Sequence, residues 1–115
     1  MNNKQLDFNL LGGYLTNLGK QTVNKMLELY EQQSKVYLLD IEQALVISSQ
    51  QLWQEHCHKM KGASASVGLT QVNSLLVVME KSNKEETLKA EDIKQLKSLN
   101  EAAITAFTQW LATID

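Results

Sequence analysis

The chain has 115 residues, a formal net charge of −2, 43% hydrophobic residues and 21% charged residues. This length suits one domain with a modest core and is too short for two, so residues 1–115 are expected to form a single domain. The sequence has no basic stripe of the kind that neutralises phosphates along a duplex, which argues against a nucleic-acid partner. Its longest apolar run, Leu75–Met79, is too short to span a bilayer.

Cysteine usage and the first residues indicate the compartment. The one cysteine, Cys57, cannot form an internal disulfide and fits a reducing environment. No positively charged start followed by an apolar stretch is visible, so no signal peptide is expected. We therefore expect a soluble, cytoplasmic domain that makes no direct membrane contact.

Helix breakers are scarce in this sequence. It contains no proline and five glycines, which favours long helices. A short first helix is expected after Asp7, which suits an N-cap, and Gly19 should end it. Gly12 and Gly13 weaken this helix, so we expect it to depend on docking against the rest of the domain.

Two longer helices are predicted next. Apolar positions recur at three-and-four spacing over 23–45, which makes one apolar face on the second helix. The third helix is expected over about 50–67. Ser48 and Gln51 have capping-box spacing before it, and Gly68 is placed to close it.

The fourth and fifth helices complete the predicted domain. The fourth carries apolar residues over 72–79, with Thr70 as its expected cap. After the polar segment 82–86, apolar positions over 93–114 lie near a heptad repeat. Four amphipathic helices with short connections predict an all-α, antiparallel four-helix bundle with the short first helix as a lid. Because the seams of such a bundle use the apolar faces, we expect a monomer.

The third helix carries both histidines of the chain. With about 100° of rotation per residue, one side of this helix is apolar. That side is formed by Leu52, Trp53, His56, Met60, Ala63 and Val67, with Cys57 and Ser64 at its margin. His56 should therefore lean into the bundle. His58 falls nearly opposite the centre of this side and should stand in solvent, whereas Cys57 is interpreted as a small core residue.

The exposed neighbours of His58 indicate a specialised surface. Lys61 and Gly62 follow it by three and four residues, so both are its neighbours on the helix. An exposed helical glycine costs about 1 kcal/mol against alanine, which a flat patch open to a partner would explain. Ala65 keeps that patch low. Lys61 suits the binding of a dianionic phosphoryl group, whereas Lys59 points to another side and is the weaker candidate.

Together these residues resemble a motif of a known protein family. The segment His58-Lys59-Met60-Lys61-Gly62, followed by Gly68, resembles the His-x-x-Lys-Gly…Gly signature of histidine-containing phosphotransfer (HPt) domains. The continuation over 63–69 is similar to the HPt modules that end tripartite hybrid sensor kinases of anaerobic respiration. This resemblance implies that His58 is the phosphoacceptor through its Nε2, that Lys61 assists the phosphoryl group, and that Gly62 gives an incoming receiver domain clearance.

Glu80 departs from the family pattern. The resemblance implies a polar side chain, commonly glutamine, on the following helix, where it hydrogen-bonds the active imidazole. Glu80 stands at that spacing. A carboxylate can orient an imidazole but would repel a phosphoryl group, and a plain solvated charge is the alternative interpretation.

The resemblance also implies the reaction and the partners. A receiver's phospho-aspartate donates to His58, and a second receiver later removes the group. The receiver should bring the Mg²⁺ and its acidic cluster, so this chain should need no metal or other cofactor. No glycine-rich ATP loop is present, because Gly12-Gly13 lacks the P-loop pattern. We expect a phosphocarrier and not an enzyme, and an excised terminal domain of a sensor kinase more than a free-standing protein.

Two alternatives remain open. A metal site would use His56, Cys57 and His58 with Glu55, but positions two apart on a helix point about 200° apart, which makes a shared ion the weaker hypothesis. An HPt-like interaction module would keep the bundle without the chemistry, with His58 as an ordinary surface residue.

Overall fold

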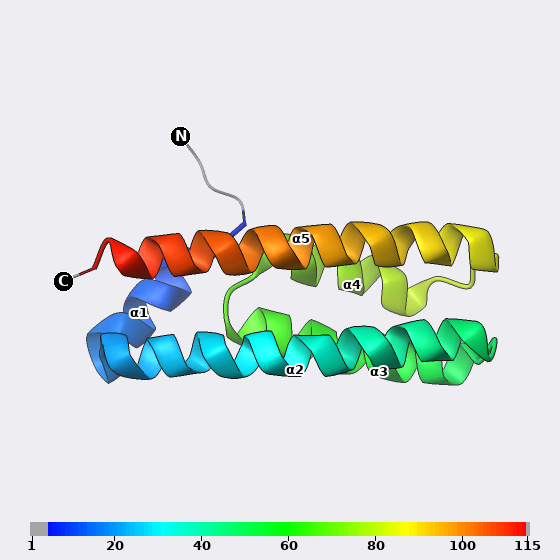
Figure 1. Cartoon of the computed structure of the whole chain (residues 1–115), viewed down its shortest axis with the longest axis horizontal. Coiled ribbons are helices and arrows are strands. Elements are labelled where there is room, and N and C mark those ends of the chain that lie inside the picture. The colour runs from blue at the N-terminus through cyan, green and yellow to red at the C-terminus, as the bar shows by residue number, and fades with distance from the viewer. Residues whose placement is uncertain (1–4, 115) are drawn as a thin grey trace.

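The computed structural model describes residues 5–114 and contains five helices in chain order (Figure 1). They are α1 (Phe8–Leu18), α2 (Lys20–Val46), α3 (Gln50–Ser66), α4 (Thr70–Lys81) and α5 (Glu86–Ala112). Within the described residues there is no strand, and a single isolated antiparallel bridge joins Leu6 to Leu69. The predicted all-α class is confirmed, and no helix in this range is both long and apolar enough to cross a membrane.

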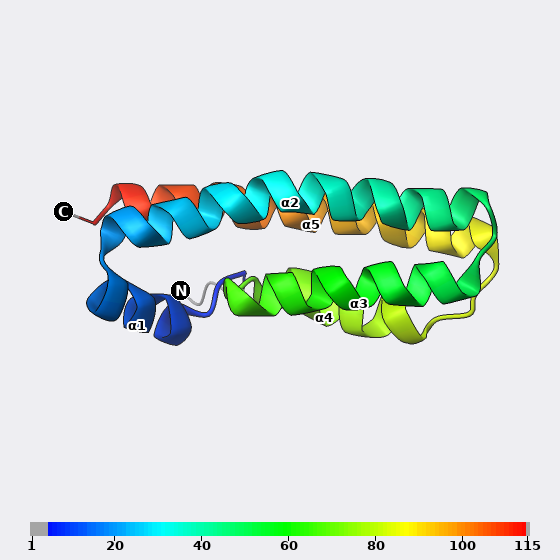
Figure 2. The ribbon, with the colours of Figure 1, turned by 90° about the horizontal axis from the view of Figure 1, so that it is seen from below.

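The five helices form an elongated bundle with principal extents of 47, 27 and 18 Å. Helices α2 and α5 run its whole length, whereas the shorter α3 and α4 pack along one part of them (Figures 1 and 2). Helix α1 occupies the end that α3 and α4 leave free, where it contacts α2. Phe8 of α1 also reaches α5, with its ring 6.0 Å from that of Trp110. The predicted four-helix bundle with a docked first helix is confirmed.

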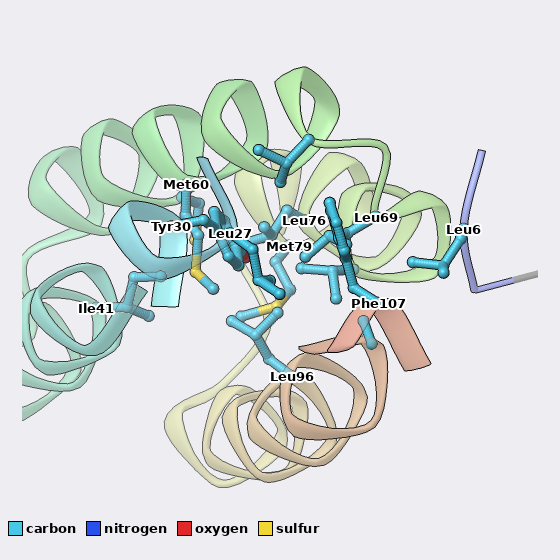
Figure 3. Close-up of a cluster of buried hydrophobic side chains, with 14 of the residues drawn as sticks. Leu6, Leu27, Tyr30, Ile41, Met60, Leu69, Leu76, Met79, Leu96 and Phe107 are labelled. Atoms are coloured by element: carbon cyan, nitrogen blue, oxygen red, sulfur yellow. The ribbon is translucent and has the colours of Figure 1, made fainter. Parts of the chain in front are cut away.

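All five helices contribute to one apolar core (Figure 3). The largest fully buried side chains include Leu11, Ile41, Trp53, Met60, Leu76, Leu96 and Phe107. Between α2 and α5 the core also holds a polar chain. The Tyr30 hydroxyl donates to Asn100 Oδ1 over 2.7 Å, and Asn100 Nδ2 donates to Ser34 Oγ over 3.1 Å. Because every member has a partner, these polar side chains can occupy the predicted apolar stripes without a large desolvation penalty.

Three of the predicted helix ends are confirmed. Asp7 caps α1, since its Oδ1 accepts from the backbone N–H of Leu10 over 3.1 Å. Gly19 ends α1 with φ 87°, and Gly68 follows α3 with φ 71°. Both angles lie in the region that favours glycine.

Two predicted caps are wrong. The α3 N-cap is Ser49 and not Ser48: Ser49 Oγ accepts from the Leu52 N–H, whereas Ser48 has φ 56° in the preceding turn and bonds to Glu86. Thr70 is the first residue of α4 and not its cap. Its backbone N–H instead donates to the Gln5 carbonyl over 3.1 Å, because the segment before α1 lies along residues 68–70.

Candidate functional site

The buried face of α3 sets the direction of every other side chain on this helix. Trp53, Cys57, Met60 and Ser64 are buried and define its centre. Trp53 locks the helix against α4, since its indole N–H donates to the Met79 carbonyl over 2.7 Å. The prediction that placed Cys57 and Ser64 at the margin is wrong. Because α3 packs against α4 as well as α2, the centre of the face is turned toward α4.

The two histidines have the different environments that the helical rotation predicts. The His58 side chain is 66% exposed, whereas that of His56 is 19% exposed. His56 faces α2, where its Nδ1 lies 3.9 Å from Asp40 Oδ2. His58 lies on the side of α3 that faces α4. The predictions that His56 leans into the bundle and that His58 stands in solvent are confirmed.

His58, Lys61 and Glu80 form a compact cluster across α3 and α4. Glu80 Oε2 lies 3.0 Å from His58 Nδ1, and Glu80 Oε1 lies 2.6 Å from Lys61 Nζ. The Glu80 side chain is 22% exposed, so it is not the plain solvated charge of the alternative interpretation. Asn73, two turns before Glu80 on α4, adds a further link, because its Nδ2 donates to the Lys61 carbonyl over 3.0 Å. Sequence reasoning did not identify Asn73, for which the only signal is its spacing of seven residues before Glu80.

The charge of Glu80 determines how the imidazole is held. The Lys61 ammonium, aided by the His58 ring, holds the pKa of Glu80 below its ordinary value, against an opposing effect of desolvation. Glu80 is therefore ionised at neutral pH. Because a carboxylate only accepts hydrogen bonds, the contact requires the His58 proton on Nδ1. This tautomer leaves the Nε2 lone pair of an exposed ring free for nucleophilic attack.

The small residues near His58 leave the protein surface beside its ring unobstructed. Gly62 is exposed, and a Cβ placed on it would meet no atom within 4 Å. Ala65 is also exposed, one turn further along. Lys59 lies closer to the site than its predicted direction suggested, because it lines the same surface hollow as His58 and Glu80.

The remaining reactive groups on α3 do not join this cluster. Cys57 is fully buried, and burial, reinforced by the charges of Glu80 and Asp92, raises the pKa of its thiol to about 12. The interpretation of Cys57 as a core residue is confirmed. Because His56 and His58 face acids on different helices, they do not converge, and no group of three or more metal-binding side chains occurs within residues 5–114.

Comparison with known proteins identifies the class. A profile of the Hpt domain matches residues 25–106, which is more than half of the chain, and the chain therefore belongs to the Hpt family. Members of this family are phosphocarriers of two-component signalling, not catalytic domains, and they interact with the receiver domains of response regulators.

A solved structure agrees with this assignment. The chain is similar to the histidine-containing phosphotransfer domain of ArcB from Escherichia coli, with 25% sequence identity and a TM-score of 0.85. The similarity covers 96% of each chain. No curated protein sequence matches the chain.

Proposed function

We propose that His58 is a phosphorelay intermediate, which takes a phosphoryl group from the phospho-aspartate of one receiver domain and passes it to the aspartate of another. The observation that carries this proposal is the state of the imidazole. Its ring is 66% exposed, yet its Nδ1 is engaged by Glu80 at 3.0 Å. The ring is thus oriented through one nitrogen and open to an incoming group at the other.

The proposed step is a displacement at phosphorus. Nε2 of neutral His58 attacks in line, an N–P bond forms, and the P–O bond to the donor aspartate breaks. The aspartate leaves with the bonding pair as a carboxylate. Since the proton on Nδ1 stays, the phosphorylated ring is cationic, and the Glu80 carboxylate lies beside that charge. Attack by the second receiver's carboxylate reverses the step and restores the neutral ring.

In this scheme, the neighbours of His58 provide positive charge for the phosphoryl group and leave space for the receiver domain. The Lys61 ammonium, held 2.6 Å from Glu80, can form a charge-assisted hydrogen bond to the phosphoryl group and offset its repulsion by that carboxylate. Gly62 gives the receiver clearance close to the ring. The small side chain of Ala65 also leaves space near the ring. Lys59 adds positive charge to the surface hollow beside His58.

The proposal assigns the metal to the partner. The receiver supplies Mg²⁺ and its acidic cluster, and this chain contributes the acceptor and its immediate electrostatics. The chain then acts in the cytoplasm without a cofactor of its own. Labelling of the isolated chain by ATP alone would contradict its role as a carrier.

The test is phosphoryl transfer from a phosphorylated receiver domain, with Mg²⁺ present. The chain provides a matched control, because His56 and His58 lie on one helix. We expect acid-labile, alkali-stable label on the parent and on His56→Gln, and none on His58→Gln. Label on His58→Gln would place the acceptor elsewhere. Failure of several receivers to label the parent would leave the bundle as a docking module.

A further inference from the structure

An apolar stripe remains uncovered on the outside of α2. Of the ten large apolar side chains exposed on the described surface, half lie on this helix and the turn that follows it. They are Leu29, Val36, Leu39, Val46 and Ile47, with exposed fractions between 48% and 75%. We call these five residues the outer stripe. The expectation of a monomer assumed that the bundle uses all apolar faces, and the outer stripe contradicts that premise.

The outer stripe follows a heptad pattern on the face opposite the core. Leu29, Val36 and Gln43 are spaced by seven, and so are Gln32, Leu39 and Val46, three residues further on. At 100° per residue, these positions point away from the buried side of α2. Within residues 5–114, α2 contacts α1, α3 and α5, and the exposure of the stripe shows that none of them covers it.

The two rows occupy the core positions of a coiled-coil seam, with leucine or valine at four of the six sites and Gln32 and Gln43 at the other two. Exposed apolar stripes of this kind mark interaction sites. We propose that the outer stripe pairs with the outer stripe of a second copy of this chain, in an antiparallel arrangement about a two-fold axis between Val36 and Leu39. Heptad register then places Leu29 against Val46, and Gln32 against Gln43, of the second copy.

The charges that flank the stripe favour a second copy in this orientation. Lys35 is exposed and comes opposite Glu42 of the second copy, and two-fold symmetry makes this attraction twice. Glu42 is 37% exposed and uses Oε2 for Lys97 at 2.8 Å, so its other oxygen is available. Ile47 comes opposite Met26 of the second copy. A parallel pair would instead place Ile47 beside Glu42, an apolar group against a charge.

The size of the seam limits its strength. From Leu29 to Ile47 the stripe extends along about 27 Å of helix, which is shorter than stable coiled coils and standard interfaces. We therefore expect a weak, reversible dimer that forms only at high protein concentration. Because His58 faces α4 and the stripe lies on α2, dimerisation leaves the imidazole open.

Sedimentation equilibrium of the chain up to about 1 mM tests the proposal. The mass should rise from 13.0 kDa toward twice that value with concentration. Leu39→Lys should stay at 13.0 kDa, whereas Leu88→Lys, at another exposed leucine on α5, should dimerise like the parent. Circular dichroism checks that both variants are folded. A parent that stays monomeric, or a Leu39→Lys variant that dimerises like the parent, would overturn the proposal.

A charge exchange tests the orientation. Lys35→Glu should weaken dimerisation by about tenfold, and the added substitution Glu42→Lys should restore it. Lys94→Glu makes the same change of net charge at an exposed site on α5 and should leave the dimer unchanged. An equal effect of Lys35→Glu and Lys94→Glu would refute the antiparallel pairing.

Discussion

Replacement of Gly62 by alanine should stabilise the free domain and impair its function. Gly62 lies within α3 on its exposed side, and a Cβ there meets no atom within 4 Å. Helix propensity favours alanine by about 0.8–1.0 kcal/mol, and no contact in the folded chain opposes this gain. The free energy of unfolding should therefore rise by about 1 kcal/mol, and Tm by roughly 4 °C for a domain of this size.

Transfer should change in the opposite direction. The added methyl group occupies the surface one turn from His58, where the proposed partner approaches the ring. Because small displacements of reacting groups have large kinetic effects, we expect the initial rate of transfer from a phosphorylated receiver to fall by about tenfold or more. Urea unfolding and the labelling assay, performed on one preparation, measure both effects.

Gly13→Ala is the matched control for this prediction. Gly13 is also helical and has no atom within 4 Å of an added Cβ, but it lies in α1. Its substitution should stabilise the domain similarly and leave transfer unchanged. Loss of stability in Gly62→Ala would refute the propensity argument. A transfer rate equal to that of the parent would show that Gly62 provides no clearance.

Three further side chains give separate predictions. Glu80→Gln should accept phosphate at a rate within a few-fold of the parent, because an amide oxygen can still accept from His58 Nδ1. Glu80→Leu should accept phosphate about tenfold more slowly. If Glu80→Leu is labelled as fast as the parent, Glu80 has no role at the site. Since the folded-state pKa of Glu80 is lowered, its carboxylate stabilises the fold above the unfolded pKa of about 4.3 and loses this effect as the pH falls through the folded value. The difference in urea midpoint between the parent and Glu80→Gln should thus shrink as the pH falls from about 6 to about 3. Tyr30→Phe leaves Asn100 Oδ1 buried without its donor and should lower the free energy of unfolding by about 1–3 kcal/mol, and no change in urea unfolding would contradict this. Cys57 should react with thiol reagents at pH 8 about a thousandfold more slowly than a free cysteine, unless urea is added; fast labelling of the native chain would show that it is accessible.

Local signals in the sequence predicted most of the helices. Apolar spacing identified all five elements, and Asp7, Gly19 and Gly68 marked three of their ends. These features depend on residues close in the chain, so they can be read without knowledge of the fold. The cap of α3 was misplaced by one residue because Ser48, with φ 56°, belongs to the turn that closes α2, where the Ser49 N–H donates to the Ala44 carbonyl over 2.9 Å.

Contacts between segments far apart in the chain have no comparable pattern in the local sequence. The segment before α1 bonds to residues 68–70, which explains why the Thr70 cap was predicted wrongly. Lys89 is 8% exposed, with Nζ 4.8 Å from the centre of the Trp53 ring and bonded to Gln50. A lysine is seldom buried, and its burial here depends on neighbours from another helix.

The sequence by itself determined which side of α3 carries His58, because helical rotation is a local property and opposite sides of one helix have opposite environments. It also determined that Gly62 and Lys61 accompany the imidazole on the surface. Only the tertiary structure decided that Glu80 joins His58 to Lys61, and that the outer stripe of α2 stays uncovered. Periodicity defines the phase of a helix about its own axis, whereas the packing of neighbouring helices selects which side chains meet and which remain exposed.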